Sequence, residues 1–277
     1  MSSKVPPIIL NNGVEMPQLG FGVWQVPDAE AERAVATALQ AGYRSIDTAA
    51  IYGNEEGTGK AIAASGIPRE DIFVTTKLWN SDQGYDSALR AFDTSLARLG
   101  LEYLDLYLIH WPMAPKGRFV ETYKAFEKLL ADGRVRAIGV SNFLPEYLER
   151  LIAETSVIPA VNQIELHPHL QQHAAREYHT DQGIATEAWS PIGQGKGLLE
   201  VPAIVAIAQK HNRTPAQVVL RWHIQLGNIA IPKSVTPSRI EENIQVFDFS
   251  LDDEDLAAIS ALNEDRRLGP NPATFMA

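Results

Sequence analysis

The feature that most constrains the fold of this chain is a regular alternation of strand-like and helix-like segments. Short apolar or β-branched runs recur eight times along the 277 residues, and a segment of helical periodicity follows each of them. The expected strands cover residues 19–22, 45–47, 72–77, 104–110, 135–141, 161–166, 184–189 and 229–232. The expected helices cover residues 29–41, 54–65, 85–99, 119–131, 145–154, 171–182, 202–211, 237–246 and 250–262, with a further helix starting at Thr214.

Strands that alternate with helices indicate a parallel sheet with helices packed outside it. Several of the expected strands are continuous apolar runs, which is typical of strands whose two faces are both covered. Eight such units in 277 residues predict an α/β fold of the (β/α)8 TIM barrel type. An open, doubly wound sheet is the structural alternative.

Two regions lie outside the eightfold pattern. Residues 8–16 carry two short apolar runs around Asn12-Gly13, which predicts an N-terminal β-hairpin that could plug one end of a barrel. The helices expected near the end of the chain add extra C-terminal helices to the barrel. Because no linker or low-complexity segment interrupts the pattern, we expect a single domain over residues 1–277.

Charge and residue usage exclude several classes of protein. The formal net charge of −10 argues against a nucleic acid or an anionic membrane as a partner. There is no cysteine, which excludes a disulfide framework, a thiolate metal site and a cysteine nucleophile. No apolar run resembles a signal peptide or a membrane span. We expect a cytoplasmic protein with no metal.

Polar residues gather where the expected strands end. Asp47, Lys77 and His110 end the second, third and fourth strands, and Tyr52 lies in the loop after Asp47. Asn54 is the expected N-cap of the next helix. Because the carboxyl ends of barrel strands carry the chemistry, we interpret these four titratable residues as one catalytic site.

The chemistry that this set suits is proton donation by a phenol. A free tyrosine has a pKa of about 10, so it is a weak acid at neutral pH. The Lys77 ammonium would lower the pKa of Tyr52, and Asp47 would hold the lysine charged and in place. A neutral His110 could hydrogen-bond a substrate carbonyl. Together they would protonate a carbonyl oxygen as it becomes an alkoxide, while a hydride arrives from elsewhere.

A candidate cofactor site follows the last expected strand. Lys233, Ser234 and Arg239 surround the start of a helix with Thr236 as its expected N-cap, a combination typical of anion sites. In barrels, phosphate sites often follow strands seven and eight. Trp189, at the end of strand seven, offers a flat face for an aromatic ring.

Two other interpretations assign a functional site to Glu165. Glu165 with His167 and His169 could bind a metal, although the extended spacing disfavours it. Glu165 and Glu187, on neighbouring strands, could form the carboxylate pair of a glycosidase. That interpretation would leave Lys77, Tyr52 and Lys233 without a role.

Long motifs in this chain resemble those of the aldo-keto reductase family over nearly its whole length. They are residues 42–49 (Gly-Tyr-Arg-Ser-Ile-Asp-Thr-Ala), 52–55 (Tyr-Gly-Asn-Glu), 104–112 (Leu-Asp-Leu-Tyr-Leu-Ile-His-Trp-Pro) and 231–234 (Ile-Pro-Lys-Ser), followed by Arg239 and Asn243. Residues 50–57 (Ala-Ile-Tyr-Gly-Asn-Glu-Glu-Gly) and 161–168 (Val-Asn-Gln-Ile-Glu-Leu-His-Pro) are most similar to the bacterial 2,5-diketo-D-gluconate reductases.

The resemblance implies a (β/α)8 barrel that binds NADP(H). It implies the catalytic residues Asp47, Tyr52, Lys77 and His110. The implied cofactor contacts are Gly22, Val23, Ser141, Asn142, Gln163, Trp189, Ser190, Lys233, Ser234, Val235, Arg239, Glu242 and Asn243. Within this set, Trp189 would stack on the nicotinamide, and Lys233, Ser234 and Arg239 would bind the 2′-phosphate. The implied walls of the substrate pocket are Trp24, Trp79 and Trp111.

The expected function is therefore NADPH-dependent reduction of aldehydes or ketones by hydride transfer, with Tyr52 as the proton donor. The expected partner is a small carbonyl substrate, such as 2,5-diketo-D-gluconate or another small dicarbonyl, and a monomer is expected. A barrel that binds the cofactor as a regulatory or redox-sensing module without significant turnover is the alternative.

Overall fold

The computed structural model of the chain describes residues 5–277, and its centre is a barrel of parallel strands. Within these residues, eight strands pair in the order β10-β9-β8-β7-β6-β5-β4-β3, and each neighbouring pair is parallel. The strands are β3 (Phe21–Gly22), β4 (Ser45–Asp47), β5 (Phe73–Leu78), β6 (Leu104–Ile109), β7 (Val135–Ser141), β8 (Val161–Glu165), β9 (Ala185–Trp189) and β10 (Ile229–Ala230).

Backbone hydrogen bonds join the two ends of this sheet. Gly20 N donates to Ala230 O at 2.9 Å, and Ala230 N donates to Gln18 O at 3.1 Å. Gly22 N donates to Pro232 O at 3.0 Å. The sheet is thereby closed on itself, so the predicted (β/α)8 barrel is confirmed and the open doubly wound sheet is wrong.

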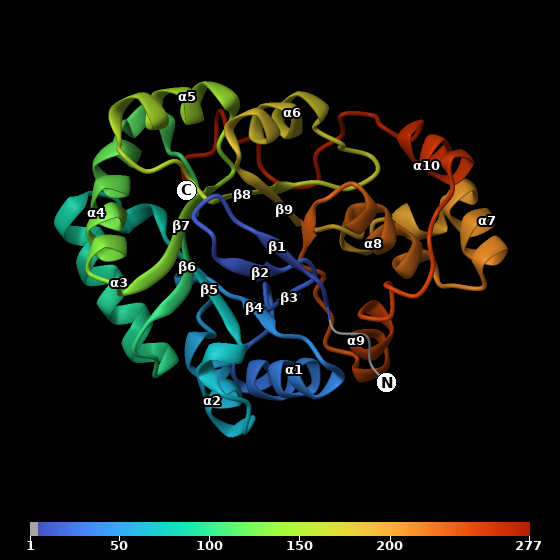
Figure 1. Cartoon of the computed structure of the whole chain (residues 1–277), viewed down its shortest axis with the longest axis horizontal. Coiled ribbons are helices and arrows are strands. Elements are labelled where there is room, and N and C mark those ends of the chain that lie inside the picture. The colour runs from blue at the N-terminus through green and yellow to red at the C-terminus, as the bar shows by residue number, and fades with distance from the viewer. Residues whose placement is uncertain (1–4) are drawn as a thin grey trace.

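Helices surround the barrel, and at least one follows each strand (Figure 1). They are α1 (Asp28–Ala41), α2 (Glu55–Ala64), α3 (Tyr85–Leu99), α4 (Phe119–Ala131), α5 (Pro145–Glu154), α6 (His173–Gln182), α7 (Pro202–His211), α8 (Pro215–Gln225), α9 (Pro237–Asn243) and α10 (Asp253–Ser260). The last two helices are shorter than the sequence predicted. None of the helices between residues 5 and 277 combines the length and apolarity that crossing a bilayer requires.

The predicted N-terminal hairpin is present and covers one end of the barrel (Figure 1). Strands β1 (Pro7–Ile9) and β2 (Glu15–Pro17) pair antiparallel, with Ile8 opposite Met16. Met16 and Leu10 share an apolar cluster with Leu106 and Leu108 of β6. Because strand side chains alternate between faces, the intervening Tyr107 packs in the larger cluster that contains the helices.

Candidate active site

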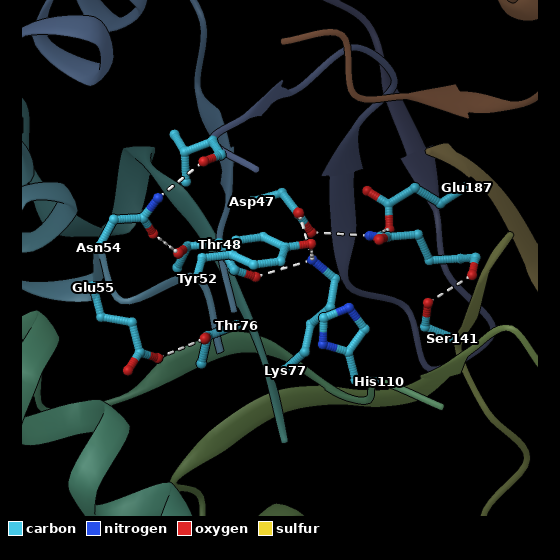
Figure 2. Close-up of polar contacts among 12 residues, drawn as sticks. Asp47, Thr48, Tyr52, Asn54, Glu55, Thr76, Lys77, His110, Ser141 and Glu187 are labelled. Atoms are coloured by element: carbon cyan, nitrogen blue, oxygen red, sulfur yellow. Dashed lines mark hydrogen bonds and ion pairs between the residues drawn. The ribbon is translucent and has the colours of Figure 1, made fainter. Parts of the chain in front are cut away.

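The structure brings the four predicted catalytic residues together at the carboxyl ends of β4, β5 and β6 (Figure 2). Asp47 ends β4, Lys77 lies at the end of β5, and His110 directly follows β6. Lys77 Nζ donates to Asp47 Oδ1 at 2.5 Å and to Thr48 O at 2.9 Å. It also lies 3.5 Å from Tyr52 Oη. One buried ammonium thus contacts both the acid and the phenol.

Tyr52 is positioned by a short 3-10 turn, η1 (Ala50–Tyr52), and by the next residue but one, Asn54. Asn54 occupies the N-cap position of helix α2, as predicted, but its side chain makes no capping hydrogen bond. Asn54 Nδ2 donates to Val23 O and Val26 O, both at 2.9 Å, and its Oδ1 accepts from Thr48 Oγ1 at 2.7 Å. Asn54 therefore fastens the Tyr52 loop to the loop after β3.

The pKa of Tyr52 differs from the value that the sequence predicted. Burial raises the pKa of Tyr52, Lys77 lowers it and Asp47 raises it, and the net effect is a raised pKa. The prediction of a lowered pKa considered the ammonium and left out desolvation of the phenolate. Tyr52 consequently holds its proton at neutral pH, which suits a proton donor.

The pKa values of Lys77 and His110 shift in opposite directions, although burial lowers both. Burial alone would lower the pKa of Lys77, but the charge and hydrogen bond of Asp47, together with the neighbouring Tyr52, outweigh it and the pKa is raised. Burial, assisted by the Lys77 charge, holds the pKa of His110 well below its ordinary value. His110 is therefore neutral at neutral pH, as predicted. Its ring lies edge-on to Tyr52, with centroids 5.7 Å apart.

The residues assigned to the nicotinamide lie beside this set, at the ends of β7, β8 and β9. Trp189 Nε1 donates to Asn142 Oδ1 at 2.8 Å, and Asn142 Nδ2 donates to His110 O at 2.9 Å. Ser141 Oγ donates to Gln163 O at 2.8 Å. Asn142 and Ser190 each directly follow a strand and have positive φ angles of 62° and 51°. Such backbone strain in non-glycine residues is typical of functional sites.

The residues assigned to the other end of the cofactor lie on and around β10 and α9. Lys233 and Arg239 make no ion pair with a carboxylate in the described part of the chain, and Ser234 and Val235 lie between them. Thr236 occupies the N-cap position of α9, as predicted, although its side chain makes no capping hydrogen bond.

Other residues of the predicted cofactor set form hydrogen bonds within the protein. Glu242 Oε1 accepts from Thr214 Oγ1 at 2.7 Å, and the neighbouring Asn243 is buried. Gly22 is fastened to Pro232, and Val23 N donates to Asp47 O at 3.1 Å. These bonds place the β3 loop between the catalytic set and the Lys233 segment.

The three predicted pocket tryptophans differ in exposure. Trp24 is 42% exposed and Trp111 is buried. The Trp79 ring lies edge-on to His110, with centroids 5.3 Å apart. Sequence reasoning missed Phe275, whose ring centroid is 4.3 Å from that of Trp111. Residues near the end of the chain therefore help to form this wall.

Glu165 proves to hold this C-terminal segment. Its carboxylate accepts hydrogen bonds from Leu268 N at 2.6 Å, Gly269 N at 3.1 Å and His167 Nε2 at 2.9 Å. Glu187 instead contacts Gln163 inside the barrel, at 2.8 Å. The two carboxylates of the glycosidase interpretation thus belong to different hydrogen-bonded groups.

Comparisons with known proteins agree with this geometry. A model of the aldo/keto reductase family matches residues 18–264. An aldo-keto reductase of Mycolicibacterium smegmatis is 63% identical, with 98% of each chain covered. Glyoxal reductase of Bacillus subtilis is 54% identical, with 95% of each chain covered. The crystal structure of a Gox0644 mutant in complex with NADPH has a TM-score of 0.95 and 50% identity, covering 99% of this chain and 100% of that one.

The (β/α)8 barrel, the lysine held between an acid and a tyrosine, and the similarity to reductases and to an NADPH complex together define an oxidoreductase. The chain belongs to the aldo/keto reductase family.

Proposed function

We propose that this enzyme reduces small aldehydes or ketones to alcohols at the Tyr52, Lys77, Asp47 and His110 site, with NADP(H) as its cofactor. The observation that carries the proposal is the Lys77 ammonium, which lies against both Asp47 Oδ1 and Tyr52 Oη. A buried cation next to a phenol stabilises the negative charge that appears when the phenol gives up its proton.

The residues present fit the cofactor. Lys233 and Arg239 supply cations for the 2′-phosphate, and the partly exposed ring of Trp189, anchored to Asn142, supplies a stacking face. Ser141, Asn142 and Gln163 supply polar groups for the nicotinamide carboxamide. When bound, NADPH supplies the hydride that the carbonyl carbon accepts.

The chain's own residues handle the carbonyl oxygen. A neutral His110 orients this oxygen, and the protonated Tyr52 donates its proton as charge develops there. Lys77 stabilises the resulting phenolate, and Asp47 keeps Lys77 charged and in place. The rings of Trp79, Trp111 and Phe275 supply apolar surface on the His110 side of the site.

We further propose a small dicarbonyl as the substrate class. Support comes from the name of the 54% identical glyoxal reductase and from the motif resemblance to 2,5-diketo-D-gluconate reductases. A compact substrate also suits a pocket walled by Trp79, Trp111 and Phe275.

The proposal is tested by following NADPH absorbance after adding methylglyoxal, phenylglyoxal, 2,5-diketo-D-gluconate, an aromatic aldehyde or a sugar aldehyde. A parallel series uses NADH. We expect turnover with NADPH that exceeds turnover with NADH, and the highest kcat/KM with one of the dicarbonyls. Tight NADPH binding without turnover of any compound would contradict the proposed reduction.

A further inference from the structure

The amide nitrogen of Gln163 lies between two buried carboxylates inside the barrel, those of Asp47 and Glu187. Gln163 Nε2 donates to Asp47 Oδ2 at 2.9 Å and to Glu187 Oε2 at 2.8 Å. A side-chain amide has two N–H donors on one nitrogen and an acceptor on its oxygen. Because both donors are engaged by carboxylates, Gln163 Oε1 remains as the acceptor available to a ligand.

The two carboxylates differ in their ionic partners. Asp47 pairs with the Lys77 ammonium, whereas Glu187 receives its hydrogen bond from the uncharged amide. Glu187 Oε1 is buried and has no hydrogen-bond partner among residues 5–277. An ionised carboxylate in that position would be costly, because its charge would be desolvated while the nearby Lys77 ammonium is paired with Asp47. The geometry therefore favours a neutral Glu187 that carries its proton on Oε1.

The groups around Glu187 act on its pKa in both directions. Burial and the charge of Asp47 raise the pKa, the Gln163 hydrogen bond and the Lys77 charge lower it, and the net result is a pKa of about 8. Asp47 on β4, Lys77 on β5 and Tyr52 on η1 are the titratable groups that act on it from inside the barrel. On the outer side of β9, His179 of α6 bonds the neighbouring Thr186.

We propose that Glu187 is a positioning residue of the reductase: as a neutral acid, it holds the Gln163 amide in one orientation and keeps a second negative charge away from Lys77 and Tyr52. The inference rests on the proposed function, in which Gln163 contacts the nicotinamide carboxamide. Ionised Glu187 would raise the pKa of Tyr52 further, so the phenol would release its proton less readily.

The protonation of Glu187 is tested first, without cofactor or substrate. Carboxyl 13C NMR of the glutamate-labelled wild type, with Glu187→Gln to assign the resonance, gives the titration directly. We expect the Glu187 carboxyl to stay neutral at pH 7 and to ionise near pH 8. A Glu187 that is already ionised at pH 6 would overturn the proposal.

Positioning of Gln163 is tested by NADPH affinity, measured by quenching of tryptophan fluorescence. Glu187→Leu leaves a buried N–H without its acceptor, and we expect an affinity loss of about tenfold. Glu187→Gln restores a carbonyl acceptor, so it should bind NADPH nearly as tightly as the wild type at pH 7. Glu55→Gln is the matched control, because Glu55 is also buried but bonds Thr76 Oγ1. Unchanged affinity in Glu187→Leu would overturn the positioning role.

The charge effect is tested in the alcohol-oxidising direction, where Tyr52 must first lose its proton. Removing an ionisable group near the phenol should shift the rise of kcat with pH about one pH unit lower in Glu187→Gln. The Glu55→Gln profile should coincide with that of the wild type. Coincident profiles for Glu187→Gln and wild type would overturn the charge effect. Absence of turnover in every variant would count against the proposed function, while the NMR and binding results would still decide the role of Glu187.

Discussion

Lys77 shows most clearly what a single residue contributes to this site. It stands at the end of an apolar strand, where a buried ammonium requires partners, and it finds Asp47, Thr48 and Tyr52. That requirement is visible in the sequence, because strand ends in a barrel converge. The raised pKa of Tyr52 was not predictable, because it depends on how far the phenol is desolvated.

Glu187 could not be assigned from the sequence for a related reason. A glutamate within a strand indicates nothing about which side chain of the neighbouring strand it will contact. Its contact with Gln163 depends on inward-pointing residues of adjacent strands β8 and β9, in which Gln163 is directly paired with Glu187. Parallel register placed these two residues together, and the sequence alone does not give the register.

The first prediction concerns the choice between NADPH and NADH. Lys233→Ala should weaken NADPH binding by about 10- to 100-fold, the usual cost of losing a hydrogen bond to a charged group. NADH affinity should change little, because NADH has no 2′-phosphate. Fluorescence titrations with both cofactors measure the difference, and Lys124→Ala on the exposed face of α4 is the control. Equal losses for NADPH and NADH would exclude a phosphate contact by Lys233.

The C-terminal segment is the element that sequence reasoning described least well. It has no regular secondary structure after α10, so it carries no periodic signal. Its contacts are to residues about a hundred positions earlier, such as Glu165 with Leu268 and Gly269. By contrast, β4, β7, α3, α4, α5 and α7 have the predicted bounds, because apolar runs, helical periodicity, Pro and Gly mark them locally.

The second prediction tests how closely this segment approaches Trp189. A Cβ atom at Gly269 would lie 2.4 Å from Cη2 of Trp189, so Gly269→Ala must displace either the segment or the ring. We expect weaker NADPH binding and a changed tryptophan emission spectrum, with the barrel still folded. Ala273→Ser, at an exposed position of the same segment, is the control. Wild-type NADPH affinity in Gly269→Ala would show that the contact does not support Trp189.

At the scale of the whole molecule, the alternation of strands and helices was enough to predict a closed barrel, since few other folds accommodate eight such units. The single domain over residues 1–277 and the monomeric state stay predictions. The distribution of buried titratable groups, however, emerges only from the assembled structure. Three histidines on different elements share one property: burial holds the pKa values of His110, His179 and His223 below the ordinary value.

The third prediction is that the free energy of unfolding falls as the pH falls from 6 to 5. The pKa values are about 4 for His179 and about 3 for His223, whereas unfolded histidine titrates near pH 6.5. The unfolded chain therefore binds more histidine protons than the folded one, about two at pH 6 and about three at pH 5. The raised pKa of Glu187 acts in the opposite direction, because the folded state holds that proton. The net difference of between one and two protons corresponds to roughly 2 kcal/mol per pH unit.

Urea unfolding of the cofactor-free protein at pH 6.0, 5.5 and 5.0 measures this slope. A single transition is expected if residues 1–277 form one domain. His223→Gln should reduce the slope by about one proton, because this ring is buried and accounts for one of the three. A stability that is constant or rises between pH 6 and 5 would contradict the assignment of buried neutral histidines.

The central claim is that Tyr52 donates the proton in an NADPH-dependent reduction, and Tyr52→Phe tests it most directly. The phenylalanine keeps the ring but removes the hydroxyl that lies 3.5 Å from Lys77 Nζ. On the best carbonyl substrate at pH 7, we predict that kcat falls by at least about 100-fold, the usual contribution of a positioned general acid. NADPH affinity should remain within about twofold of wild type. If Tyr52→Phe reduced the carbonyl at the wild-type rate with unchanged NADPH binding, the proton would come from another group and the account would be wrong.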